Sequence, residues 1–299
     1  MPSGPTTTSS LSDSLQQILD NARMRREYGT RVVNTVDKRT LPKNTGLKWS
    51  EVAVERIDAQ DIDEDTDLNN FQMLVDTLFD IEPVQSGLAT FMTYKAKDRV
   101  ASETLAETGS TMQNAIERKK DKDGIVIFDS FSSASAPGAG ATLTQGHIGA
   151  CVANVREGGT TAATSEPWDG GIAFIGHSFQ ILDLENEPLS GIGTYPTPNG
   201  LTDEIYRNGF KGMCRGAEVF PDDLITIDSS DDAKGCVFAR GKGGAIVFVQ
   251  GSSPRKMERE NPARGGGGIE MFLYDDYAYG IRNANWGREV YSDATRPTS

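Results

Sequence analysis

The sequence predicts an α+β protein built around one long helix and one long strand. Residues 268–280 follow a run of glycines and carry a tyrosine-rich strand pattern about twice the usual strand length. Residues 93–120 contain no proline and place apolar residues at helical spacing, which predicts a helix about 40 Å long. Residues 129–250 mix shorter helix and strand patterns. A long helix lying along long strands would form a flat, elongated plate.

The first thirty residues predict an arm outside the main body. The opening is rich in Pro, Thr, Ser and Gly, a composition that cannot bury a core. Ser10 can then cap a short amphipathic helix, whose apolar stripe includes Leu15 and Ile18 and whose end carries Arg25 and Arg26. Such a helix predicts docking, either onto the chain's own body or onto a neighbouring subunit.

Residues 31–57 predict two strands joined by a turn at residues 42–46, and therefore a projecting hairpin. An ordinary surface hairpin is the plainer alternative. The candidates for contact with another subunit on this segment are Arg39, Lys43, Lys48 and Trp49.

The charge of the chain is uneven. The formal net charge is −13, which argues against a protein that binds duplex nucleic acid through phosphate contacts. Residues 23–48 nevertheless hold eight basic residues against Glu27 and Asp37, a local balance of +6 that leaves −19 for the remainder. Complementary potentials steer association, so this segment predicts a contact with an acidic neighbouring subunit. A solvated, flexible arm is the alternative.

The remaining patterns fill in the two halves of the chain. Before the long helix, residues 71–79 have helical spacing and residues 88–92 predict a short strand. A Ser-, Ala- and Gly-rich stretch at residues 130–144 marks the crossing into the second region. There we expect helices around residues 148–155, 179–182 and 202–210, and strands at residues 172–175, 224–227 and 245–249.

The acidic run at residues 61–67 resembles a calcium-binding loop only in part. Alternate carboxylates are how an EF-hand presents oxygen ligands, but the required glycine is replaced by Thr66 and the bidentate glutamate by Gln72. A solvated acidic loop is the expectation, and we expect no metal site and no cofactor.

Side chains that carry chemistry are sparse. His147 and His177 belong to no hydrolase or metalloprotease motif, so we expect each to cap or pack, and Ser178 to be a helix N-cap. The glycine clusters at residues 241–244 and 265–268 lack the spacing of a phosphate loop and predict tight turns. The widely spaced Cys151, Cys214 and Cys236 predict buried, reduced thiols.

Six segments carry a further signal, namely residues 112–121, 176–181, 193–196, 225–235, 277–280 and 291–295. They resemble tailed-phage major capsid proteins, and the resemblance extends over about residues 30–299. It implies the Hong Kong 97-like fold and a structural role without an active site. The implied division is an N-terminal arm at 1–30, an extended loop at 31–70 reaching over an adjacent subunit, a peripheral domain at 71–128 and 251–299, and an inserted axial domain at 129–250.

The resemblance also implies partners and location. The chain is expected to assemble with itself into hexamers and pentamers of an icosahedral head around double-stranded DNA, with portal, scaffold or decoration proteins as further partners. No apolar run reaches membrane-spanning length and the opening lacks the features of a signal peptide, so we expect assembly in the host cytoplasm and a place in the virion capsid. The alternatives are an encapsulin-like shell around protein cargo and a small-molecule enzyme with a cleft between its two domains.

Overall fold

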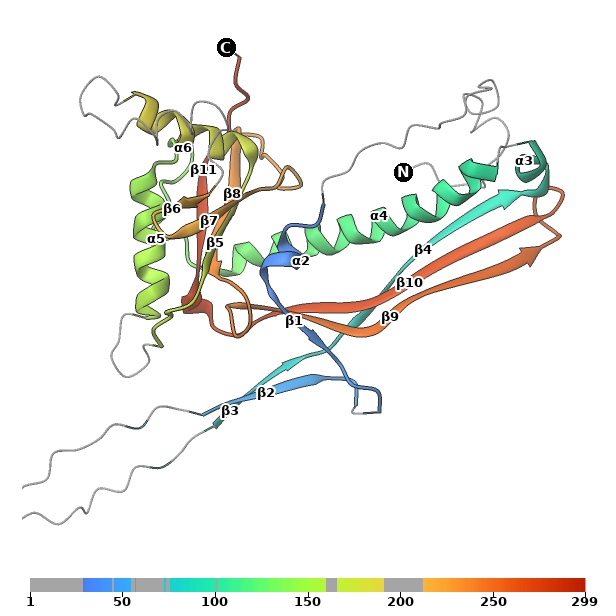
Figure 1. Cartoon of the computed structure of the whole chain (residues 1–299), viewed down its shortest axis with the longest axis horizontal. Coiled ribbons are helices and arrows are strands. Elements are labelled where there is room, and N and C mark those ends of the chain that lie inside the picture. The colour runs from blue at the N-terminus through green and yellow to red at the C-terminus, as the bar shows by residue number, and fades with distance from the viewer. Residues whose placement is uncertain are drawn as a thin grey trace, which may run out of the picture.

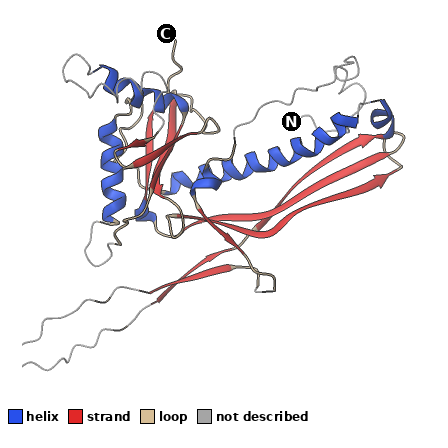
Figure 2. Cartoon of the chain, in the orientation of Figure 1, coloured by secondary structure: helices blue, strands red, loops and turns tan. Residues whose placement is uncertain are grey.

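The computed structural model describes residues 29–44, 46–54, 57, 73, 76–99, 102–159, 166–190 and 212–298. Figure 1 shows a long, narrow plate with a second sheet at one end and a two-stranded ribbon that projects away from both. Helices and strands are segregated, with the longest helix lying along one face of the plate (Figure 2). The predicted α+β class and the predicted plate are confirmed.

The elements have the following bounds. The helices are α2 (Val32–Thr35), α3 (Tyr94–Arg99), α4 (Ser102–Val126), α5 (Gln145–Glu157) and α6 (Ser178–Ser190), with short 3-10 turns at Ile127–Ser130 and Ala284–Trp286. The strands are β1 (Asp37–Thr40), β2 (Trp49–Val54), β3 (Asp76–Ile81), β4 (Val84–Thr93), β5 (Ile172–Gly176), β6 (Met213–Cys214), β7 (Ala217–Pro221), β8 (Asp232–Ala239), β9 (Ile246–Asn261), β10 (Gly268–Ile281) and β11 (Gly287–Asp293).

The plate is a four-stranded sheet in the order β1-β9-β10-β4. The two central strands, β9 and β10, are antiparallel and pair from Asn261 opposite Gly268 to Ile246 opposite Ile281. Their connection needs three consecutive residues in the left-handed region, Gly265 at φ 60°, Gly266 at φ 80° and Gly267 at φ 89°, which only glycine adopts without strain. The predicted long strand and glycine turn are confirmed.

The long helix α4 lies across this sheet and is held there at two places. Close to its middle, Met112 packs with Met92 and Met271 in a small core of its own. Near its end, the Tyr279 hydroxyl donates to the Lys120 carbonyl at 3.0 Å, and the Lys120 ammonium pairs with buried Asp275 on β10. The predicted helix is confirmed from Ser102 onward, but Thr93 ends β4 and residues 94–99 form the separate helix α3. Helix α4 also continues to Val126, so the basic residues expected in its last turn lie inside it.

Gly124 allows α2 to pack directly on α4. A Cβ at this buried position would lie 2.6 Å from Val32 Cγ1 and 3.1 Å from the Tyr279 ring. We therefore expect Gly124→Ala to lower the free energy of unfolding by about 1–3 kcal/mol through overpacking. Gly109→Ala is the matched control, because nothing lies within 4 Å of its Cβ position and alanine should stabilise the helix by up to about 1 kcal/mol. Urea unfolding of the unassembled chain measures both, and equal effects would contradict the packing argument.

The second sheet has the strand order β11-β8-β5-β7-β6 and contains the main core. All five residues of β5 are buried, and α5 and α6 supply Ile148, Val155 and Leu184 to the same core. The three predicted elements here, a buried strand followed by a helix and an earlier helix at α5, are confirmed. Strand β11 joins this sheet through β8, although its residues lie in the expected peripheral range.

Three local predictions are wrong. Residues 31–57 do not form a hairpin with themselves, because Val32 begins the short helix α2, β1 pairs in parallel with β9, and β2 pairs with β3. Residues 76–79, placed in a helix by their apolar spacing, belong to strand β3. Residues 224–227 form no strand and contribute only a single bridge from Ile227 to Ala233. The expected helices at residues 11–22 and 202–210 lie outside the described residues.

Both histidines take part in capping a helix N-terminus. The N-terminus of α5 is a capping box, in which Thr144 Oγ1 accepts from the backbone N–H of His147 and the His147 ring accepts from the N–H of Thr144 at 3.3 Å. At α6 the ring of His177 accepts from Phe179 N at 3.2 Å, and His177 N donates to Gln180 Oε1 at 3.0 Å. The capping residue of α6 is therefore His177, and the prediction that Ser178 would fill this role is wrong.

Candidate assembly surfaces

The ribbon formed by β2 and β3 leaves the plate as two strands, and no other strand of the described residues pairs with them. Its pairs run from Trp49 opposite Ile81 to Val54 opposite Asp76. At the base Trp49 packs edge-on against Phe79, with ring centroids 6.3 Å apart, and Ile81 is buried against the β9 residues of the plate. The base of the ribbon therefore belongs to the body of the chain, and the part beyond it does not.

The outer part of the ribbon exposes apolar side chains on one face. Val52 and Val54 are two residues apart and so share a face, and Leu78 lies opposite Val52 on the partner strand. Their side chains are 54%, 63% and 65% exposed. A two-stranded ribbon is marginally stable in water, and gathered apolar side chains mark surfaces that another molecule covers.

A charged cluster fixes the ribbon to the plate. Arg282, just after β10, donates to Glu51 on the ribbon at 2.7 Å and to Asp37 on β1 at 2.9 Å. Burial raises the pKa of Asp37, but the N–H of Gly243 and the Arg282 guanidinium outweigh it and hold this pKa below its ordinary value. The cluster therefore stabilises the folded chain above the pKa of an unfolded aspartate and loses that contribution as the pH falls through the lower folded pKa.

The charge of the ribbon is opposite to the one expected for the projecting segment. Strands β2 and β3 carry Glu51, Asp76 and Asp80 and no basic residue. In the sequence, residues 49–82 hold eleven acidic residues and one basic residue, a balance of −10. The basic segment at residues 23–48 comes before the ribbon in the chain. The prediction that positive charge lies on the projecting hairpin is wrong, because it rested on pairing residues 31–36 with residues 49–57.

The eight residues predicted to contact other subunits fall into three groups: some lie outside the described residues, some contact their own chain, and some are exposed. Leu15, Ile18, Arg25 and Arg26 lie outside the described residues. Arg39 pairs with Asp37 of its own chain at 3.1 Å, and Trp49 packs on Phe79. Lys43 and Lys48 are exposed, and Lys48 is 3.9 Å from equally exposed Glu82. The sequence prediction did not include Leu78, because its place opposite Val52 depends on the pairing of β2 with β3.

The distal half of β9 is a second open surface. Strand β1 pairs with β9 only as far as Gln250, so the residues beyond it form an edge of the sheet. Residues 253–260 are exposed, including Met257 at 59%. Pro254 and a 2.8 Å ion pair between Lys256 and Glu258 lie on this edge, and proline and charge are what discourage uncontrolled strand pairing.

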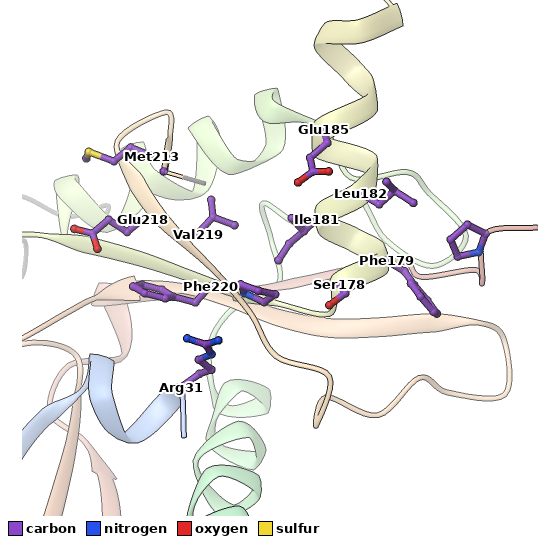
Figure 3. A pocket seen from close by; sticks show the side chains of 13 residues that line it. Arg31, Ser178, Phe179, Ile181, Leu182, Glu185, Met213, Glu218, Val219 and Phe220 are labelled. Carbon is purple, nitrogen blue, oxygen red and sulfur yellow. The ribbon is translucent and has the colours of Figure 1, made fainter. Parts of the chain in front are cut away.

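A hollow of about 870 Å³ lies between α6 and β7 (Figure 3). Its wall is largely apolar, with Phe179, Leu182 and Phe220 facing it and Glu185 and Glu218 at its polar side. Neither histidine lines it. The enzyme alternative required a pocket that gathers a histidine with carboxylates, and this hollow does not provide one.

Other chemical sites are equally limited within the described ranges. There, no group of three or more His, Cys, Asp or Glu side chains is placed to hold a metal ion. Burial raises the pKa of Cys151 and Cys214 to about 11, which keeps both as thiols, and Cys236 is buried as well. In the part of the chain that the structure describes, no helix is long and apolar enough to cross a membrane. The acidic loop at residues 61–67 lies outside that part.

The chain matches no protein-family model and no curated protein sequence. It does match solved capsid structures over nearly its full length. The capsid of Ralstonia phage GP4 is similar at a TM-score of 0.67 and 12% identity, covering 95% of this chain and 96% of that one. The capsid of cyanophage P-SCSP1u is similar at a TM-score of 0.66 and 10% identity, covering 95% of both chains.

An encapsulin is similar to the same degree. The holo-SrpI encapsulin complex from Synechococcus elongatus PCC 7942 gives a TM-score of 0.66 at 10% identity and covers 99% of both chains. At these identities the comparison establishes the fold. The chain has the Hong Kong 97-like fold found in tailed-phage major capsid proteins, as its sequence motifs implied.

Proposed function

We propose that this chain is the major capsid protein of a tailed phage, and that it assembles into hexamers and pentamers of an icosahedral shell around double-stranded DNA. The ribbon is the observation that carries the proposal. Its exposed residues Val52, Val54 and Leu78 form an apolar face at the end of a fold shared with shell proteins. A neighbouring copy that covers this face removes it from water at every subunit contact.

In this proposal each part of the chain corresponds to one part of a capsid subunit. Residues 1–30 form the arm and residues 31–70 the extended loop, which supplies strand β2 of the ribbon. Residues 71–128 and 251–299 make the peripheral domain, and residues 129–250 make the axial domain. Strand β11, at Gly287–Asp293 of the peripheral range, pairs with β8 of the axial range and so connects the two domains. In the arm, Leu15, Ile18, Arg25 and Arg26 contact a neighbouring subunit.

The role in this proposal is structural and not catalytic. Both histidines are occupied as helix caps, and the thiols are protonated and buried. The chain assembles in the host cytoplasm and becomes part of the virion capsid. Portal, scaffold or decoration proteins are its further partners. Neither a membrane nor a cofactor takes part.

The cargo distinguishes the two kinds of shell. The full-length match to an encapsulin favours a protein-filled compartment as the second candidate. Particles that contain this chain should be treated with nuclease, opened, and analysed for protected nucleic acid and for other proteins. Protected double-stranded DNA of one length supports the phage head. A single co-purifying enzyme with no protected nucleic acid would contradict it and support the encapsulin-like shell.

Salt is expected to weaken assembly, because residues 49–82 carry a balance of −10 and meet basic groups on a neighbouring subunit in this proposal. Raising the salt from about 0.1 M to about 1 M shortens the Debye length from about 10 Å to about 3 Å. Light scattering of assembling subunits across this range should show a lower yield and a slower rate. An unchanged or larger yield would show that apolar contacts dominate.

A further inference from the structure

Two buried aspartates meet where the long helix joins the second sheet. Asp121 lies on α4 and is 1% exposed, and Asp222 directly follows β7 and is fully buried. Asp222 lies within hydrogen-bonding reach of the Asp121 carboxyl group. Two carboxylates this close cannot both stay ionised in a buried site without a large electrostatic cost.

Asp121 is held as the acceptor of the pair. Its carboxylate accepts from the backbone N–H groups of Arg31 at 3.0 Å, Val32 at 2.8 Å and Val33 at 3.4 Å. These are the unpaired donors at the start of α2, which a carboxylate satisfies best when it is ionised. Asp121 therefore connects α4 to the start of α2 through these three backbone hydrogen bonds.

Asp222 is the group suited to carry the proton. Its Oδ1 accepts from Leu224 N at 2.9 Å, while its Oδ2 is buried and has no partner among the described atoms. A proton on Oδ2 would give this atom a hydrogen bond to donate to Asp121. Burial, opposed by the Leu224 N–H and reinforced by the charges of Asp121 and Asp223, raises the pKa of Asp222 to about 7.

The other titratable groups at the junction do not compete with Asp222 for this proton. In the turn before α6, His177 Nε2 lies 3.8 Å from the Asp223 carboxylate. Burial lowers the pKa of His177, which favours its neutral form. From β10, burial and then Asp121 raise the pKa of Tyr279 well above its ordinary value, so its hydroxyl stays neutral too. On α4, Lys120 is engaged with Asp275.

The side chain of Arg31 points away from the two aspartates' hydrogen bonds and has its own surroundings. It lines the hollow between α6 and β7, and its Nε is buried without a hydrogen-bond partner among the described atoms. Figure 3 shows the guanidinium directed toward Phe220. Its backbone N–H, and not its guanidinium, makes the contact with Asp121.

We propose that Asp121 and Asp222 share one proton that closes the junction of α2, α4 and the second sheet, and that the junction loosens when this proton leaves. The direction in which stability changes with pH follows from the pKa of Asp222, which is higher in the folded chain than in the unfolded chain. Between these two values the folded chain binds more protons than the unfolded chain, so stability falls as the pH rises. The unfolding equilibrium constant should increase by up to about tenfold for each pH unit in this window.

The Asp222→Asn variant tests the pair directly. Its amide can donate to Asp121 without titrating, so the wild-type rise in the unfolding equilibrium constant between pH 5 and pH 8, about 100-fold from this group, should be lost. The matched control is Asp231→Asn, which removes an exposed carboxylate at a residue with φ 63° that asparagine also tolerates. Because Asp183 and Glu289 also have pKa values raised by burial, the difference between variants is the measured quantity.

Asp121→Asn is the second variant, since its amide oxygen can still accept from α2 and its nitrogen can donate to Asp222. Urea unfolding of the purified, unassembled chain at pH 5, 6, 7 and 8 gives the constants, and hydrogen exchange of the α2 amides reports the junction itself. A flattened pH dependence in either aspartate-pair variant, with the wild-type slope in Asp231→Asn, supports the proposal. A wild-type slope in both pair variants, or α2 amides equally protected at pH 5 and pH 8 in the wild type, overturns it.

Discussion

Shells are expected to be absent when Val52 and Leu78 are both replaced by aspartate. Each side chain is more than half exposed in the single chain, so the substitutions should leave the subunit folded. Burial of a Val or Leu side chain contributes about 1.5–3 kcal/mol, and the pair would weaken each subunit contact by at least about 100-fold. Electron microscopy of the purified variant should show free subunits or small oligomers in place of shells.

Two comparisons separate lost apolar contact from a damaged ribbon or from added charge. The conservative variant Val52→Ile with Leu78→Met keeps an apolar face and should still form shells. Assembly of the aspartate variant at high salt should stay absent, because screening cannot restore apolar burial. Shells of normal size from the aspartate variant would show that this face of the ribbon is not a subunit contact.

Lys120→Ala is expected to destabilise the subunit by about 3–5 kcal/mol, the cost of leaving a buried charge unpaired. The Lys120 ammonium pairs with Asp275, whose side chain is 1% exposed, and lies 5.4 Å from the Tyr277 ring and 5.7 Å from the Phe248 ring. These contacts connect α4 to β9 and β10, so their loss separates the helix from the plate. Urea unfolding of the unassembled chain measures the change.

The neighbouring lysine provides the matched control. Lys119 pairs with Asp123 at 2.6 Å, four residues along the same helix, but both side chains are largely exposed. Lys119→Ala should therefore cost no more than about 1 kcal/mol. A double variant, Lys120→Met with Asp275→Leu, should recover much of the stability because it removes both charges. A Lys120→Ala cost no larger than that of Lys119→Ala would contradict the buried pair.

The elements that the sequence predicted well are those with local causes. The strand at residues 268–280 combines aromatic residues with a glycine turn, and the structure has β10 at Gly268–Ile281 after three left-handed glycines. The helix α5 could be predicted from the spacing of Ile148, Val152 and Val155, all of which are buried on one face. In each case the deciding interactions lie within a few residues of one another.

The elements that were mispredicted depend on distant partners. Val32 and Val36 were assigned to a strand, but α2 is capped by Asp121, 89 residues from Val32. Leu78 fitted a helical stripe, but pairing with Val52 places it in a strand, because cross-strand contacts override weak local preference. The pairing of β11 with β8 is likewise set by residues about fifty positions apart.

The candidate surfaces were predicted less completely than the fold. The exposed face of Val52, Val54 and Leu78 is visible only when β2 and β3 are known to pair, since each strand alone alternates like an ordinary half-buried strand. The negative charge of residues 49–82 could be counted from the sequence, but the positions of Glu51, Asp76 and Asp80 on the projecting ribbon required the same pairing.

Negative-stain electron microscopy of the purified full chain, at rising protein concentration, tests the central claim most directly. The proposal predicts closed shells, or rings of six and five subunits, whose formation requires the apolar face of the ribbon. A monodisperse monomer at every concentration, with or without a co-expressed scaffold, would contradict the capsid assignment.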